Sequence, residues 1–299
     1  MTFWGYGLFT LAHLSDPHLP LPPVRVRDLT FKQLTGYGNW LLKRRAVHDP
    51  LALRKIVNDL KITATDHIAI TGDLTNIARR EEFEAARKWL IGLGPQFDIT
   101  VIPGNHDAYV AGGIAMMQEA CAGSMRGDDD SAVFPFVRRR APVALVAVNT
   151  GVPTPVFMAT GCVGDAQLNR LAGTLADLKR DNLFRVVLIH HPPVSEVSPR
   201  KRLTDSAELM KVIAAHGAEL VLHGHDHIHE LHWLHGPAGR IPAVGVPSAS
   251  GAPGKARNPA AYNLYRIEGG AGAWRCEMES RGIGGDGKVA TLKRTMLTS

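Results

Sequence analysis

Five short hydrophobic runs, each followed directly by a polar block, constrain the fold of this chain most. The runs cover residues 9–14, 67–71, 99–102, 185–189 and 219–222. Runs of this length that are rich in Val and Ile are typical of buried strands. Segments with helical periodicity begin between them, after Asp49, Arg79, Asp165 and Asp205. The alternation predicts an α/β fold with a largely parallel sheet covered by helices on both faces.

The polar blocks contain residue types that bind metals. They supply Asp16, His18, Asp73, Asn105, His190, His225 and His227. In α/β sheets, ligands collect beyond the carboxyl ends of the strands, so we expect these side chains to meet in one site. The i, i+2 spacing of Asp16 with His18 predicts extended chain with both side chains on one side. Gly72, Gly104 and Gly224 allow sharp turns or close backbone approach there.

This donor set indicates a pair of metal ions. Carboxylate, imidazole and amide donors without thiolates suit Mn²⁺, Fe or Zn²⁺. Seven candidate ligands are too many for one ion and suit two ions that share a ligand. The alternative, a polar cluster satisfied without a cation, is disfavoured because burying so many donors is costly. Two divalent cations also leave the site net positive, which favours a phosphodiester anion as substrate.

The blocks D-x-H, G-D, G-N-H-D, H and G-H-x-H occur in this order, and together they resemble the signature of the calcineurin-like metallophosphoesterases. The resemblance implies a four-layer sandwich of two mixed β-sheets flanked by α-helices, forming a single domain over residues 1–299. It implies hydrolysis by a hydroxide that bridges the two metals. It also implies that one metal is bound by Asp16, His18 and His227 and the other by Asn105, His190 and His225, with Asp73 bridging.

Two further residues have expected roles in catalysis. His106 is similar to the family histidine beside the leaving group, and Asp107 is expected to orient its ring. Purple acid phosphatases place a tyrosine ligand three residues after the bridging Asp, where this chain has Asn76. A ferric tyrosinate centre is therefore disfavoured, and we expect Mn²⁺, with Fe or Zn²⁺ as alternatives. His191, next to a ligand, is expected to support the site without binding metal.

The insertion over residues 19–45 suggests the substrate. It carries Phe31, Tyr37 and Trp40 just before Lys43-Arg44-Arg45, an arrangement that meets anionic lipid surfaces. Its GY-x-NW-x-x-K/R-R core resembles bacterial phospholipase C-type enzymes that release diacylglycerol from phosphatidylcholine or phosphatidylethanolamine. We therefore expect a phospholipid substrate, with membrane contact through residues 31–45. The alternative is a helix that covers the core, with the apolar stems of its basic side chains lying along it.

Other functions remain open at this point. A soluble cyclic-nucleotide phosphodiesterase could use Arg200-Lys201-Arg202 as an anion clamp. A non-catalytic scaffold of the same fold is disfavoured because all seven candidate ligands are present. Nucleic acid is not an expected partner, because no aromatic-basic module occurs beyond the insertion.

Composition limits the remaining choices. The 299 residues carry a formal charge of +6, and 45% are hydrophobic, which excludes a disordered chain. No apolar run is long enough for a membrane span and no signal peptide is evident, so we expect a cytoplasmic protein, peripheral on the inner face of the membrane. Three separated cysteines argue against a disulfide framework. Beyond residue 227, β segments near 241–246, 262–267 and 274–279 predict a second, antiparallel sheet, and residues 282–299 a mobile tail.

Overall fold

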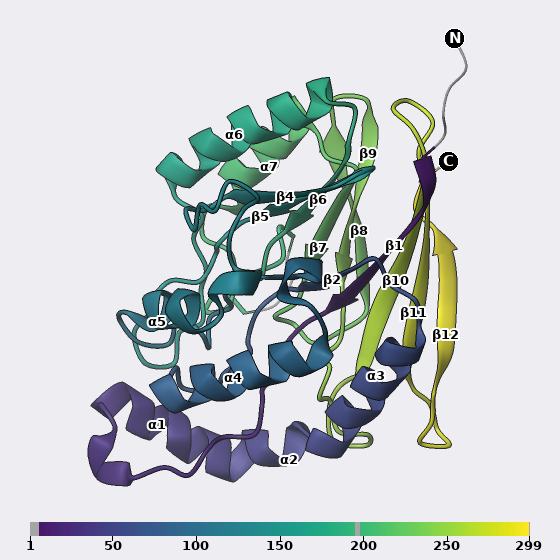
Figure 1. Cartoon of the computed structure of the whole chain (residues 1–299). Coiled ribbons are helices and arrows are strands. Elements are labelled where there is room, and N and C mark those ends of the chain that lie inside the picture. The colour runs from purple at the N-terminus through teal and green to yellow at the C-terminus, as the bar shows by residue number, and fades with distance from the viewer. Residues whose placement is uncertain (1–5, 195–197, 299) are drawn as a thin grey trace.

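Two six-stranded sheets pack face to face in the computed structural model of this chain, which describes residues 6–194 and 198–298. Helices α3 (Pro50–Ile62) and α4 (Arg80–Leu93) lie along the first sheet, while α6 (Asp165–Arg180) and α7 (Ser206–His216) cover the second (Figure 1). The predicted sandwich of two mixed sheets flanked by helices is confirmed.

The first sheet has the strand order β12-β11-β10-β1-β2-β3. Its members β1, β2 and β3 are parallel, and β10 to β12 extend it in antiparallel fashion. The bounds are β1 Tyr6–Leu14, β2 His67–Ile70, β3 Ile99–Val101, β10 Ala261–Gly269, β11 Arg275–Ile283 and β12 Val289–Met296.

The second sheet has the order β4-β5-β6-β7-β9-β8, with parallel pairing from β5 to β9 and antiparallel strands at both edges. The bounds are β4 Phe136–Arg140, β5 Val143–Ala147, β6 Phe184–Leu188, β7 Leu220–His223, β8 Glu230–Gly236 and β9 Gly239–Gly245. Strands β4, β5 and β8 were not among the predicted elements, whereas the five predicted core strands are all present.

Two parts of the sequence prediction for the C-terminal region are wrong. The predicted strands exist, but β9 joins the second sheet beside β7, and β10 and β11 join the first, so they form no separate sheet. Residues 282–299 contain β12, which pairs with β11. This edge strand is largely exposed and polar, so it lacks the alternating pattern that marks a half-buried strand.

Local chemistry satisfies free N–H groups at the start of α3. Asp49 caps α3, because its carboxylate accepts from the Leu51 N–H at 2.8 Å and Pro50 is the first helical residue. Asp205 directly precedes α7, but its side chain does not cap that helix. The Asp205 carboxylate instead accepts from the N–H groups of Val163 and Gly164, at 2.9 and 2.7 Å, at the start of α6.

The insertion forms a helical arm at the carboxyl ends of the central strands. It comprises α1 (Phe31–Asn39), the π-helix η2 (Trp40–Arg44) and α2 (Arg45–Val47) (Figure 1). Thr30 and Gln33 form a capping box at its start. The remaining short elements are η1 (Val26–Asp28), η3 (Gln96–Asp98), α5 (Gly113–Ala120) and η4 (Ala122–Ser124).

Candidate metal centre

Asp16, His18 and His227 form one group of candidate ligands. Asp16 and His18 follow β1, and His227 follows β7 on the other sheet. Asp16 Oδ1 lies 3.1 Å from His227 Nε2 and 3.9 Å from His18 Nε2. One ligand atom from each residue lies within 4.8 Å of the others, so the three can hold one ion.

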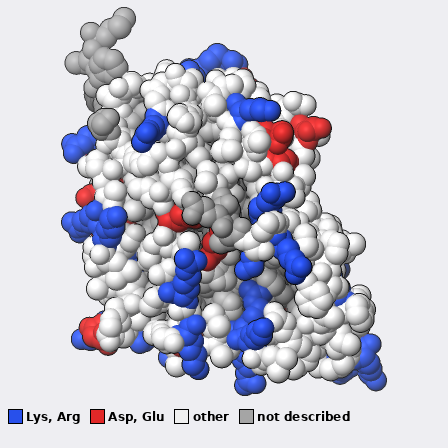
Figure 2. Space-filling model, turned by 180° about the vertical axis from the view of Figure 1, so that it is seen from behind, with Lys and Arg blue, Asp and Glu red and all other residues white. Residues whose placement is uncertain are grey.

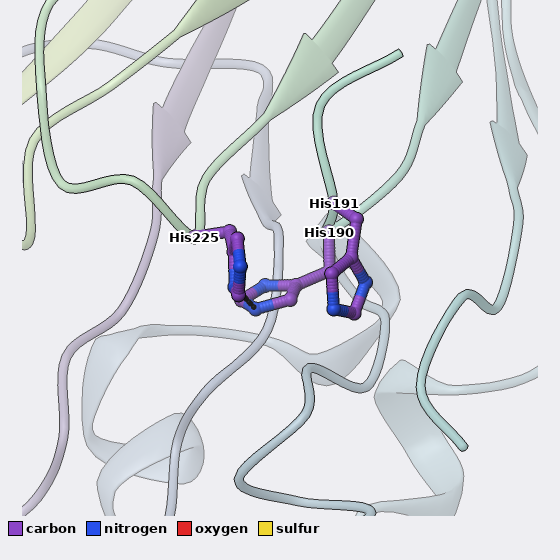
Figure 3. Close-up of side chains that lie close together, drawn as sticks. All are labelled: His190, His191 and His225. Atoms are coloured by element: carbon purple, nitrogen blue, oxygen red, sulfur yellow. Dashed lines mark hydrogen bonds between the residues drawn. The ribbon is translucent and has the colours of Figure 1, made fainter. Parts of the chain in front are cut away.

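Asn105, His190 and His225 form a second group. Asn105 Oδ1 lies 3.1 Å from His190 Nε2 and 2.9 Å from His225 Nδ1, and the two imidazole nitrogens are 3.3 Å apart. Figure 3 shows His190 and His191, from the turn after β6, reaching toward His225, from the turn after β7. The structure therefore brings together the residues expected for the second metal.

Asp73 lies between the two groups. Its Oδ2 is 3.8 Å from His18 Nε2 and 3.5 Å from His190 Nε2, and its Oδ1 accepts from the His106 N–H at 2.7 Å. Asp73 therefore lies near residues of both groups, which is the position expected of the bridging ligand.

The backbone at these residues is strained. Asp16, His18, Asp73, His225 and His227 all have positive φ, between 37° and 71°. The extended geometry that the i, i+2 spacing predicted is therefore wrong, because the chain turns as soon as each strand ends. Non-glycine residues in this region are uncommon and cluster at functional sites, where surrounding structure maintains the strain.

Glycines let these turns pack against one another. A β-carbon at Gly104 would lie 2.2 Å from Asp73 Oδ1, and one at Gly224 would lie 1.8 Å from Ser15 Oγ and 2.4 Å from Asp16 Oδ2. Real β-carbons do not approach other atoms so closely, so any side chain here displaces a candidate ligand.

We expect Gly224→Ala to lower the free energy of unfolding by about 1–3 kcal/mol through overpacking, and to weaken metal binding by moving Asp16. Gly173→Ala is the matched control, since nothing outside its own helix lies within 4 Å, and alanine there stabilises the helix by up to about 1 kcal/mol. Thermal unfolding and metal titration measure both effects. A Gly224→Ala protein as stable and as metal-competent as the wild type would contradict the packing argument.

Hydrogen bonds fix the tautomers of two candidate ligands. His18 Nδ1 lies 3.1 Å from the Thr75 carbonyl oxygen, and His190 Nδ1 lies 2.7 Å from that of Thr71. A carbonyl only accepts, so each Nδ1 carries the hydrogen and each Nε2 presents a lone pair to the site. Burial lowers the pKa of His18 and of His225 well below its usual value, which favours the neutral form that binds metal.

The carboxylates make the site suitable for cations. Burial, with the neighbouring charges of Asp16 and Asp107, raises the pKa of Asp73 above its usual range. Burial also acts to raise the pKa of Asp16, but His227 beside it outweighs this effect and the pKa is lowered. His225 Nε2 is buried and has no hydrogen-bond partner among the described residues. Two crowded carboxylates beside neutral imidazoles fit a pair of divalent ions.

His106 lies beside the metal-ligand groups, but Asp107 does not orient it. His106 Nδ1 donates to the Asn76 carbonyl oxygen at 2.6 Å, so Nε2 carries the lone pair. The Asp107 carboxylate instead accepts from the N–H groups of Gly104 at 2.9 Å and Thr75 at 3.0 Å. The expected role of Asp107 is therefore corrected: it ties the loops after β2 and β3 together, and Asn76 orients the histidine.

His191 supports the site, and its nitrogens already have partners. Its Nε2 donates to the Ala159 carbonyl oxygen at 3.2 Å, and its Nδ1 accepts from the Thr150 hydroxyl at 2.8 Å. It therefore holds the loop around Ala159 next to His190.

Two residues near the ligands were not assigned to the site from the sequence. The Arg44 guanidinium reaches His18 Nε2 at 2.8 Å and also contacts His106 Nε2. The His48 ring lies 4.3 Å from the His18 ring, and its Nδ1 is 2.9 Å from Ser250 Oγ. Burial, followed by the charge of Arg44, lowers the pKa of His48 to about 2. Arg44 lies in the insertion, and His48 follows its end. The sequence prediction took site residues from the ends of strands, and neither of these residues follows a strand.

A cleft of about 410 Å³ opens beside Asn105 and His106. The arm lines one side, and the loops around residues 156–159 and 198–201 line the other. None of the described residues lining it is Asp or Glu, and its cations are Lys43, Arg44, Arg200 and Lys201. Figure 2 shows a face of the molecule with many Lys and Arg side chains and few acidic ones on its lower half. The cleft is therefore suited to an anion.

A family model described as calcineurin-like phosphoesterase matches residues 9–229, which include all seven candidate ligands. The chain belongs to this family. The family resemblance is thereby confirmed, and this calcineurin-like phosphoesterase is a metal-dependent phosphoric ester hydrolase whose family has a centre of two divalent ions. No curated protein matches the chain. The closer resemblance to phospholipase C-type enzymes stays a prediction.

Solved structures share the fold of this phosphoesterase at low identity. A dimetal phosphatase from Danio rerio is 13% identical over 96% of this chain and 99% of its own, with a TM-score of 0.62. A purple acid phosphatase from yellow lupin seeds is 11% identical over 95% and 53% of the two chains, with a TM-score of 0.59. A 5′-nucleotidase precursor from Thermus thermophilus is 14% identical over 91% and 54%, with a TM-score of 0.55. This chain spans about half the length of the latter two.

Proposed function

We propose that this protein is a phosphodiesterase of the phospholipase C type, which releases diacylglycerol from glycerophospholipids. The observation that carries the proposal is the exposure of large apolar side chains on the arm and on the facing loop, the two segments that supply the lining of the cationic cleft. Leu42 and Phe157 are each 84% exposed, and Phe31 is 76% exposed. Apolar groups that rim a cationic cleft suit a ligand whose phosphate is joined to an apolar body.

Apolar and cationic side chains of the arm and of the loop around Phe157 line the cleft, whereas Leu42 and Phe31 lie on the arm outside this lining. Trp40 and Lys43 line it from the arm, and Val156, Phe157 and Met158 line it from the facing loop. Lys43 and Arg45 are exposed, and the Arg45 guanidinium lies 6.0 Å from the centre of the Trp40 ring. This combination of aromatic rings and cations suits the headgroup region of an anionic bilayer.

The arm is fixed to the site by specific contacts. The Lys32 ammonium donates to the Thr154 carbonyl oxygen and lies 4.4 Å from the centre of the Tyr109 ring. Gln33 Nε2 donates to the Ile77 carbonyl oxygen at 3.1 Å. A membrane-contacting surface on the arm would therefore have a defined position relative to the metal ligands. Among the described residues, no helix is long and apolar enough to cross a bilayer.

The chemistry follows from the ligand geometry. When bound, two divalent ions, for which we propose Mn²⁺, supply positive charge for the phosphate and a water of lowered pKa. Asp16, His18 and His227 would hold one ion and Asn105, His190 and His225 the other, with Asp73 between them. His106 lies beside the same space, and its Nε2, once protonated, would give that proton to the departing glycerol oxygen.

We expect Leu42→Ser combined with Phe157→Ser to weaken binding to anionic phospholipid vesicles and diacylglycerol release by about tenfold or more, since each apolar side chain contributes about 1.5–3 kcal/mol when buried. Hydrolysis of a small chromogenic diester should stay within about twofold. Ile62→Ser is the matched control, because Ile62 is 83% exposed at the end of α3, away from the cleft lining. Vesicle sedimentation and mass spectrometry of the products measure the effect. Equal losses on vesicles and on the small diester would contradict membrane contact by these residues.

A soluble cyclic-nucleotide phosphodiesterase is the second candidate. Arg200 and Lys201 line the cleft opposite the arm, where they could bind the phosphate of a nucleotide. Incubating the Mn²⁺-loaded protein in parallel with phospholipid vesicles and with cyclic nucleotides separates the two functions. Turnover of nucleotides together with inactivity on vesicles would favour this second function.

A further inference from the structure

Arg44 differs from the two cations next to it in the sequence. It ends the π-helix η2, and π-helical turns are frequent at functional sites. Lys43 and Arg45 are exposed, whereas Arg44 is partly buried and its guanidinium turns toward the metal ligands. The run Lys43-Arg44-Arg45 therefore does not act as one lipid-facing cluster, as its sequence suggested.

The guanidinium of Arg44 lies where two histidine lone pairs meet. Its Nη2 donates to His18 Nε2 at 2.8 Å, and its Nη1 contacts His106 Nε2. Asp73 and Asp16 act on it through their charge. No carboxylate forms a hydrogen bond with Arg44 in the part of the chain that the structure describes, so its planar set of donors is held by neutral acceptors alone.

Arg44 and a metal ion would use the same nitrogen of His18. The single lone pair of His18 Nε2 can accept from Arg44 or bind a metal ion, but it cannot do both. A metal ion held by His18 therefore leaves guanidinium N–H groups of Arg44 to other acceptors. Arg44 also lines the cleft, where the other charged described residues are Lys43, Arg200 and Lys201, so an anion that enters the cleft is a matching acceptor.

We propose that Arg44 binds the non-bridging phosphoryl oxygens of the substrate. The planar fork of a guanidinium matches two oxygens of a phosphate, which a lysine ammonium does not. This inference rests on the proposed phosphoesterase site but not on the lipid nature of the substrate. The insertion then supplies both the apolar surface outside the cleft and a phosphate-binding group inside it.

The test uses the metal-loaded full chain with inorganic phosphate and a small chromogenic diester. Hydrogen bonds to charged groups contribute about 1.5–3 kcal/mol, which corresponds to about ten- to a hundredfold in affinity. We expect Arg44→Gln to raise both the KM and the dissociation constant of phosphate by about this factor. Arg44→Lys, which keeps the charge but loses the fork, should give an intermediate effect. Arg54→Gln, at an exposed position on α3, is the matched control and should change neither constant.

Two further measurements separate phosphate binding from a structural role. The metal content of Arg44→Gln, measured by mass spectrometry, should equal that of the wild type. Added guanidinium should restore phosphate binding and turnover in Arg44→Gly, which it cannot do for a misfolded protein. Phosphate affinity unchanged in Arg44→Gln, or loss of metal from it, would overturn the proposal. Wild-type protein that cleaves the diester but not vesicles would reject the lipid substrate and leave the role of Arg44 to be decided by phosphate affinity.

Discussion

Asp73→Asn is expected to reduce turnover of any phosphodiester by about a thousandfold or more. Loss of one positioned charge-stabilising donor costs about 10²–10³ in rate, and Asp73 would hold two cations at once. Its Oδ2 lies 3.8 Å from His18 Nε2 and 3.5 Å from His190 Nε2, so a neutral amide at this position cannot balance both ions. Metal content should fall below two ions per chain, as measured by inductively coupled plasma mass spectrometry.

Glu84→Gln provides the control for Asp73→Asn, because Glu84 is an exposed acid on α4. It removes the same charge at a distance from the candidate ligands and should retain two ions and full turnover. An Asp73→Asn protein with two ions bound and turnover within tenfold of the wild type would show that Asp73 is not the bridge.

His106→Ala is expected to reduce turnover by about 10²–10⁴, the range for a positioned general acid or base, while metal content stays unchanged. His106 Nδ1 donates to the Asn76 carbonyl oxygen, and His106 lines the cleft. The loss should be smaller on a diester whose leaving group is a nitrophenolate, because that group departs without a proton. Comparing turnover of this diester with that of an alkyl diester measures the difference.

His235→Ala is the control for His106→Ala, because His235 is exposed on β8. Its turnover and metal content should match those of the wild type. Metal loss from His106→Ala would make His106 a ligand, and equal losses on both diesters would remove its role at the leaving group.

The candidate ligands were predictable from the sequence because glycines and ligand-type residues stand directly after apolar strands. Gly72-Asp73 and Gly224-His225 mark where β2 and β7 end, and the rule for α/β sheets places such ends together. The backbone conformation was not predictable in the same way. The i, i+2 spacing of Asp16 and His18 fits extended chain, yet both residues have positive φ because the packed loops impose it.

The direction in which a side chain points could not be predicted from the sequence pattern. Nothing in Lys43-Arg44-Arg45 shows which of three equal charges turns inward, since that depends on the register of a π-helix. The role of Asp107 depends on N–H groups of its own loop and of the loop after β2, and the sequence prediction had paired it with the adjacent His106 instead. Strand β12 was missed because an exposed edge strand has no buried face to impose alternation.

Anomalous diffraction from crystals grown with manganese tests the two-metal centre most directly. The arrangement of the candidate ligands predicts two peaks, about 3.5–4 Å apart, on either side of the Asp73 carboxylate. Asp16, His18 and His227 should surround one peak, and Asn105, His190 and His225 the other. A single peak, or peaks that these residues do not surround, would contradict the assignment of Asp73 as the bridge.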